Sequence, residues 1–240
     1  MEFTMHPSLT AIVQRRAIRV FDPVDISPSL RDELLHAARL APSSFNSQPY
    51  RLFWVESPAS RRTVAQLCFN QPPAQTASVL LVAVADLDTW RSTTRGQLEW
   101  MRASGFSPEK ISEYERKSKF AKWFYIQGWC NLLGALKWIA FRLVNLWKII
   151  GMPPVTRQGL FKWATKSTSL ACENLMIAAE SLGLNTCPME GFDSRRLSHF
   201  LHLSSRHQEI VMVIAIGKKS ARHVDQPQWR RPLESTVTIL

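Results

Sequence analysis

The chain has 240 residues, enough to bury the core of one domain, and 45% of them are hydrophobic while 20% are charged. This composition excludes an intrinsically disordered protein. The formal net charge is +11, and nearly all of it lies between Glu115 and Glu173, where the chain has ten basic residues and no acidic one. The basicity therefore belongs to one segment and not to the whole surface.

Local patterns predict interleaved helices and strands. Ser27 followed by Pro28 is an N-cap with proline at the first helical position. The apolar run Ser78–Ala85 has the continuous hydrophobicity of a buried strand. In chain order we expect a helix over Ser8–Arg16, a helix from Ser27 until Pro42, a strand over Arg51–Glu56, a helix over Ser57–Leu67, the strand Ser78–Ala85, a helix starting at Ser107, a helix over Thr168–Leu182, a short strand over Asn185–Cys187, a helix capped by Asp193 and a strand over Glu209–Ile216. The class is therefore α+β, in layers.

The four cysteines, Cys68, Cys130, Cys172 and Cys187, are scattered and form no metal-binding motif. We expect buried, reduced thiols and no metal site. Met1–Phe21 lacks the apolar core of a signal peptide, so we expect a cytoplasmic setting.

Three short segments, far apart in the chain, have complementary polar chemistry. Arg15–Phe21 concentrates guanidinium groups that suit a phosphate. Ala41–Pro49 gathers hydroxyl and amide groups between prolines, and Pro188–Phe192 reads as a rigid turn that can present backbone N–H groups to a planar ring. In this order they resemble the nitroreductase family of FMN-dependent oxidoreductases, over roughly residues 8–90 and 165–240.

The resemblance implies one nitroreductase-like domain over residues 1–240, with a central mixed, mainly antiparallel sheet flanked by helices, working as a homodimer. It also assigns the cofactor site. The phosphate and the ribityl oxygens would be held by Arg15 and Arg19, with Arg16 beside them, and by Arg230 or its neighbour Arg231. The partner subunit's flavin would be reached by Pro42, Ser43, Ser44 and Asn46. The pyrimidine edge of the ring would be bonded by Asn70 and Gln71, and flavin N5 would be approached by the backbone of Glu190 and Gly191, which follow Pro188 and Met189. The chain has Ala17 where the family often has serine.

The resemblance fails in a helical insertion over about residues 96–164, which contains an amphipathic segment over about 119–152. Helical periodicity over Phe120–Met152 places Lys137 and Arg142 on one side, and Trp129, Leu136 and other large apolar residues on the other. Three interpretations stay open. The segment could lie in an anionic membrane interface, span the membrane, or cap the dimer. Nucleic acid fits poorly, because large aliphatic residues dilute the basic ones.

We therefore expect an FMN-dependent oxidoreductase that uses NADH or NADPH. It would reduce a small apolar acceptor, such as a quinone, an enone, a nitroaromatic or a lipid-like molecule, by ping-pong hydride transfer, as the resemblance implies. No residue is assigned as a general acid. The alternatives are a specialised flavin dehydrogenase or dehalogenase of the same family, and a membrane-docking flavoprotein with little turnover. The protein would be cytoplasmic, with a peripheral position on the inner face of the membrane if the insertion binds lipid.

Overall fold

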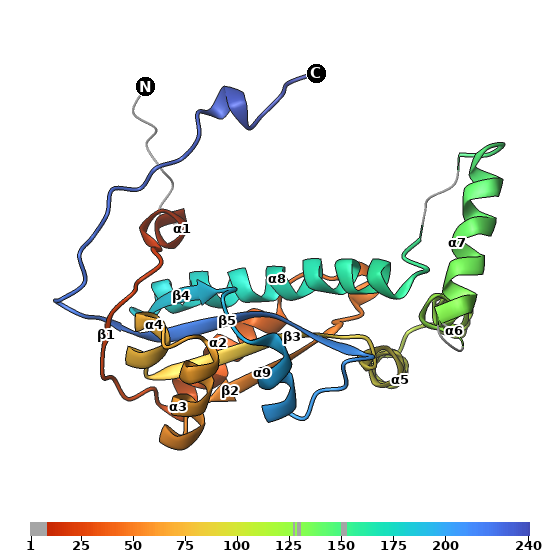
Figure 1. The fold of residues 1–240 in the computed structure, drawn as a ribbon. Coiled ribbons are helices and arrows are strands. Elements are labelled where there is room, and N and C mark those ends of the chain that lie inside the picture. The colour runs from red at the N-terminus through yellow and green to blue at the C-terminus, as the bar shows by residue number, and fades with distance from the viewer. Residues whose placement is uncertain (1–8, 127, 129–130, 150–152) are drawn as a thin grey trace.

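The computed structural model describes residues 9–126, 128, 131–149 and 153–240 and is built on one five-stranded sheet (Figure 1). The strands run in the order β1-β5-β3-β2, and β4 also pairs with β5. All the strand pairs are antiparallel, while Ala17 and Thr186 form an isolated parallel bridge. The expected mixed, mainly antiparallel sheet is confirmed. The strands are β1 (Phe21–Asp22), β2 (Tyr50–Val55), β3 (Val79–Asp86), β4 (Asn185–Met189) and β5 (Gln208–Lys219).

Helices cover both faces of the sheet. On one face, α2 (Pro28–Arg39) and α8 (Arg157–Ser181) pack over buried Leu81 and Ile214. On the other face, α3 (Pro58–Leu67), α4 (Pro72–Thr76) and α9 (Ser194–Phe200) pack over buried Leu80 and Val213. Every residue of β3 is buried, as its unbroken apolar sequence predicts.

Several boundaries differ from the sequence prediction. Helix α1 covers only Thr10–Gln14, and α8 begins at Arg157, eleven residues before the predicted start. The cause of the early start is a cap, because the side chain of Thr156 accepts a hydrogen bond from the Gly159 N–H at 3.0 Å. Strand β4 runs on to Met189, so Pro188 and Met189 belong to a strand and not to a turn. Strand β1 and helix α4 are absent from the predicted elements, because each is too short to show a periodic pattern of apolar residues.

In the region predicted to be an insertion, between β3 and α8, the described residues form three helices, α5 (Thr89–Ala103), α6 (Pro108–Tyr125) and α7 (Leu132–Asn145). Helix α5 starts before residue 96 and residue 164 lies inside α8, and the predicted insertion over about residues 96–164 stays a prediction. Stacking of Trp90 on Tyr125 (5.4 Å between ring centroids) and an edge contact of Tyr125 with Trp163 (6.1 Å) anchor the insertion to α8. Helix α7 projects from this anchor, away from the sheet (Figure 1).

The amphipathic segment is divided into two helices. Helix α6 ends at Tyr125, and Asn131, with a left-handed backbone, precedes α7. The side chain predicted for the polar face, Lys137, is only 7% exposed, and its ammonium group donates to the carbonyls of Trp123 and Ile126 at the end of α6. The prediction that Lys137 lies on the exposed polar side of one long helix is therefore wrong. Trp129 and Met152, which the sequence analysis also used, lie outside the described residues.

Cys68, Cys172 and Cys187 are buried and unpaired, as expected, and Cys130 lies outside the described residues. Burial raises the pKa of the Cys68 thiol to about 11 and that of Cys172 to about 12. Among the described residues, no helix combines the length and the hydropathy that a membrane crossing requires.

Candidate functional site

The structure brings two of the predicted flavin segments into direct contact. The side-chain amide of Gln71 donates to the carbonyl of Gly191 at 2.6 Å and to that of Cys68 at 3.0 Å. A second bond, from the Asp193 N–H to the Leu67 carbonyl at 2.8 Å, ties the same loop to the end of α3. The Gln71 amide is thus fixed at the edge of the loop that follows β4. Asn70 lies beside it, exposed and with a left-handed backbone.

The loop after β4 exposes unpaired backbone donors. Glu190 and Gly191 are exposed, and within the described part of the chain their N–H groups donate no hydrogen bond. A methyl group on Gly191 would lie 3.1 Å from the Gln71 amide nitrogen, so the loop and the amide are closely fitted. Exposed, fixed N–H groups suit the polar edge of a planar cofactor.

The N-terminal arginines lie beside the same strand. A hydrogen bond from the Ile18 N–H to the Thr186 carbonyl, 3.0 Å long, aligns their segment with β4. Burial raises the pKa of Cys187 in β4, and the positive charges of Arg19 and Arg15 oppose that rise. Arg15 also lies 3.8 Å from Glu173.

Arg16 has a structural role in this chain. Its guanidinium donates to the carbonyls of Val13 at 2.6 Å, Arg15 at 3.2 Å and Gln14 at 3.3 Å. These are the carbonyls at the end of α1, so Arg16 caps that helix. The phosphate contacts of Arg15 and Arg19 stay a prediction.

The segment from Pro42 to Asn46 lies elsewhere in the chain. It precedes β2, and the sheet order places β5 and β3 between β2 and β4. Strands β2 and β4 are therefore three strand spacings apart, which is about 14 Å. Ser44 and Asn46 therefore do not complete the Gly191 loop of their own chain. The segment includes a 3₁₀ turn over Ser44–Asn46, in which Phe45 is 78% exposed and has a left-handed backbone.

Hydrogen bonds hold this strained segment from two sides. Ser43 Oγ accepts a bond from the Gln48 N–H at 3.1 Å, while the Asn46 carbonyl accepts one from the Gln97 side chain in α5 at 2.5 Å. Pro42 is exposed beside them. The polar groups of the segment are therefore displayed on the surface of the single chain.

The C-terminal arginines do not join Arg15 and Arg19 within one chain. Figure 1 shows the C-terminal tail leaving the sheet and extending away from it. Arg230 and Arg231 are exposed there, and the hydrogen bonds described for them go to nearby carbonyls, those of Trp229 and Ser235. The tail includes a 3₁₀ turn over Leu233–Ser235. The expected convergence of these arginines on one phosphate is not seen in the single chain.

Polar residues at the end of β5 also lie near Arg19, although no sequence motif indicates them. His223 accepts a hydrogen bond from the Arg19 N–H at 3.3 Å, and Lys219 forms an ion pair with Asp225. They come close to Arg19 because β1 pairs with β5, with Phe21 opposite Lys219. That pairing joins residues about two hundred positions apart, and no local pattern indicates it.

The nitroreductase family model matches residues 12–218. The chain belongs to the nitroreductase family. The prediction of a nitroreductase-type oxidoreductase, with FMN as cofactor and NAD(P)H as electron donor, is confirmed at the level of the family.

Individual relatives cover nearly the whole chain. Protein DrgA of Synechocystis is 29% identical over 92% of this chain and 87% of its own. An NADH dehydrogenase of Thermus thermophilus is 27% identical over 95% and 93%. A solved structure from Exiguobacterium sibiricum, described as a nitroreductase in complex with FMN, has a TM-score of 0.74 at 22% identity and covers 100% of both chains. At that identity the structural likeness shows the fold.

The residues present fit FMN at one side of the site. Arg15 and Arg19 supply charge for a phosphate, the Gln71 amide is aimed at the loop edge, and the Glu190 and Gly191 N–H groups can meet polar ring atoms.

Proposed function

We propose that this protein is a homodimeric, FMN-dependent NAD(P)H oxidoreductase that reduces a small apolar acceptor. The observation that carries the proposal is the Gln71–Gly191 contact, which joins two flavin segments more than one hundred residues apart in sequence. The name of the Thermus relative, an NADH dehydrogenase, supports a nicotinamide as electron donor.

In this proposal each residue has a distinct task. Arg15 and Arg19 bind the phosphate, Gln71 fixes the loop, and the N–H groups of Glu190 and Gly191 orient the ring and tune its potential without titrating. FMN held by these residues would supply the hydride-transfer chemistry between NAD(P)H and the acceptor. The acceptor is apolar in this proposal because the insertion exposes large hydrophobic side chains near the periphery of the domain.

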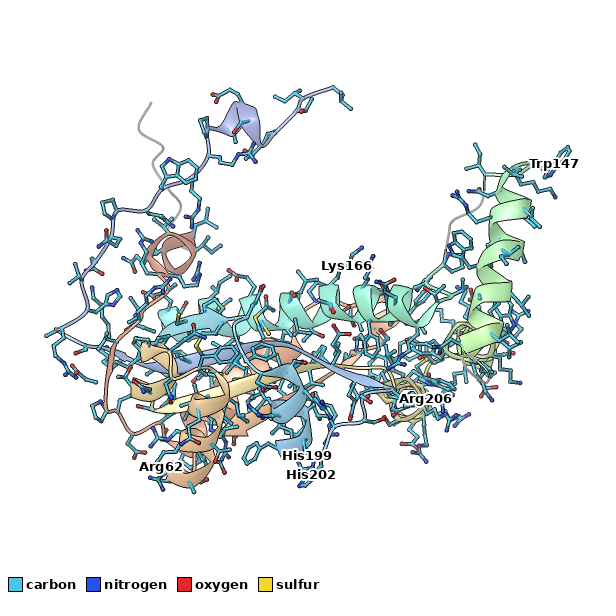
Figure 2. The ribbon with its side chains drawn as sticks, in the orientation of Figure 1. Arg62, Trp147, Lys166, His199, His202 and Arg206 are labelled. Carbon is cyan, nitrogen blue, oxygen red and sulfur yellow. The ribbon has the colours of Figure 1, made fainter. Side chains whose placement is uncertain are left out.

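The decisive variant is Arg19→Ala. It should weaken FMN binding by about 1.5–3 kcal/mol, the range for a charge-assisted hydrogen bond. Fluorescence titration of the apoprotein with FMN measures this. The matched control is Arg62→Ala, since Arg62 lies on α3, on the far side of the domain from the tail (Figure 2). Equal affinity of Arg19→Ala and wild type would refute the phosphate assignment. A screen of quinones, enones, nitroaromatics and halogenated aromatics against the reduced protein then identifies the acceptor.

A second candidate function is peripheral membrane binding through α7. Large apolar side chains on this helix and just after it are exposed, among them Leu136, Leu143 and Trp147, with Trp147 at 88%. Figure 2 shows Trp147 at the far end of α7, away from the sheet. Arg142 and Lys148 add exposed positive charge. Anionic lipid attracts each such residue by roughly 1 kcal/mol, and salt screens this attraction.

Liposome sedimentation tests this role. The protein should bind phosphatidylserine vesicles at low salt and be partly released at high salt. Replacement of Leu136, Leu143 and Trp147 by glutamine should abolish the binding and leave FMN in place. Should those replacements instead separate the dimer or expel FMN, α7 is a cap on the partner subunit and the membrane role falls. The cytoplasmic setting stays a prediction.

A further inference from the structure

A cavity of about 770 Å³ lies beyond the flavin loop, between α9, the start of α8 and the start of β5. None of the flavin residues named above lines it. Its lining includes Arg157, Arg195 and His199, three side chains that can carry positive charge. Since the rest of the site does not use them, their convergence on one cavity calls for an anionic ligand.

One face of α9 supplies much of this lining. Ser194, Arg195, Ser198 and His199 all line the cavity. Residues four apart lie on the same side of a helix, so these two i, i+4 pairs form one polar face. Leu197, on the opposite side, is fully buried in the core. Figure 2 shows His199 on α9 pointing away from the sheet.

Arg157 faces this helix from the first turn of α8, and its position is fixed. Its guanidinium donates to the Ser205 carbonyl and lies 5.8 Å from the centre of the Phe161 ring. The hydrogen bond described for it uses one of the five N–H donors of an arginine, and the remaining donors suit a phosphate.

The other walls match the remaining parts of a nucleotide. Leu203, together with the largely buried Phe161 and Ile210, provides an apolar patch against which a base can lie. Glu209, the one acidic residue among the described residues of the lining, can accept hydrogen bonds from ribose hydroxyls or from an exocyclic amine. If the cavity instead bound an uncharged electron acceptor, the side chains of Arg157, Arg195 and His199 would have no anionic partner.

We propose that this cavity binds the adenosine-phosphate half of NAD(P)H, with Arg195, Arg157 and His199 on its phosphates. The inference rests on the proposed function, because the nicotinamide must reach the flavin loop. Arg195 is only four residues beyond Gly191, so the two are at most about 14 Å apart along the chain. An extended dinucleotide spans that interval.

The test compares Arg195→Ala with a neighbouring control, Arg196→Ala. Arg196 does not line the cavity and instead lies 3.3 Å from Asp193 in an exposed ion pair. Anaerobic stopped-flow reduction of the FMN-loaded protein gives the apparent Kd and the limiting rate for NADPH, NADH and reduced nicotinamide mononucleotide. Arg195→Ala should raise the apparent Kd for NADPH about tenfold or more at an unchanged limiting rate. Arg196→Ala should change it less than twofold.

Comparison of the three electron donors shows which phosphate Arg195 contacts. If only NADPH binds more weakly, Arg195 contacts the 2′-phosphate, and if NADH weakens equally it contacts the pyrophosphate. Reduced nicotinamide mononucleotide, which lacks the adenosine phosphate, should bind the variant and the wild type alike. An equal loss with this mononucleotide, or equal effects of the two arginine variants, would overturn the proposal.

Calorimetry with adenosine 2′,5′-bisphosphate and with AMP measures the affinity of the cavity without catalytic turnover. The wild type should bind at least one of them about tenfold more tightly than Arg195→Ala does. Absence of binding to the wild type would overturn this inference alone. Failure of both NADH and NADPH to reduce the flavin would instead overturn the proposed function.

Discussion

At the scale of single residues, Gln71 decides the geometry of the candidate site. Its amide bonds two carbonyls, one at the end of α3 and one in the loop after β4. Because side-chain amide donors are directional, the pair of bonds fixes the loop relative to the sheet. The exposed N–H groups of Glu190 and Gly191 therefore keep a defined position before any ligand arrives.

Replacing Gln71 by alanine should weaken FMN binding by about 0.5–1.5 kcal/mol, the net contribution of a neutral hydrogen bond. The loss arises because the loop must then be ordered by the ligand itself. Fluorescence titration with FMN measures the effect. Gln75→Ala is the control, since Gln75 lies in α4 and is exposed. Identical affinities for the two variants would show that Gln71 does not preorganise the loop.

At the scale of elements, Lys137 holds the insertion together. A lysine ammonium at the C-terminal end of a helix satisfies carbonyls that lack intrahelical partners. Lys137 does this for α6 from the neighbouring helix α7, with its ammonium 4.4 Å from the centre of the Trp123 ring. Burial lowers the pKa of Lys137, and the carbonyls around the ammonium still favour its charged form.

Lys137→Ala should destabilise the pairing of α6 and α7 by about 1–3 kcal/mol, because it leaves two carbonyls without their donor. Hydrogen exchange followed by mass spectrometry should then show that exchange in α6 and α7 is faster in the variant than in the wild type, while exchange in β3 is unchanged. Lys148→Ala, at an exposed position just beyond α7, serves as the control. Unchanged protection of α6 in Lys137→Ala would mean that the ammonium contacts contribute little.

At the scale of the whole molecule, several exposed apolar side chains are compatible with the proposed homodimer. The tail exposes Val224, Trp229 and Leu233, and α1 exposes Ile12. In Figure 1 the tail and α7 both project on the side of the sheet that carries α8. A second copy of the chain seated over α8 would cover these side chains. The surface Ser43–Asn46 segment could then reach the partner subunit's Gly191 loop.

Complementation of two variants tests this arrangement. Arg19→Ala and Asn46→Gly should each impair FMN binding, and glycine is chosen because it tolerates the left-handed backbone of Asn46. If each site takes Arg19 from one chain and Asn46 from the other, mixed dimers contain one intact site. Subunit exchange should then restore up to half of the FMN binding per mixed dimer. No recovery, or a sedimenting monomer that retains flavin, would contradict the shared site.

Local chemistry made part of this protein predictable. The Ser27–Pro28 cap, the apolar run of β3 and the Glu190–Gly191 loop follow from side-chain properties over a few residues, so sequence identified them. The family and the position of Gln71 before β3 also came from short motifs. These features depend on neighbours along the chain.

Tertiary structure decided the rest, because it depends on contacts between distant residues. The burial of Lys137 results from the break between α6 and α7, whereas the prediction treated this stretch as one helix. The separation of Asn46 from Gly191 follows from strand order, and the approach of His223 to Arg19 follows from the pairing of β1 with β5. The sequence by itself determined which chemical groups the protein carries and the family to which it belongs. Only the fold decided which of those groups meet within one chain, because hydrogen bonds and packing act across space between residues that the sequence separates.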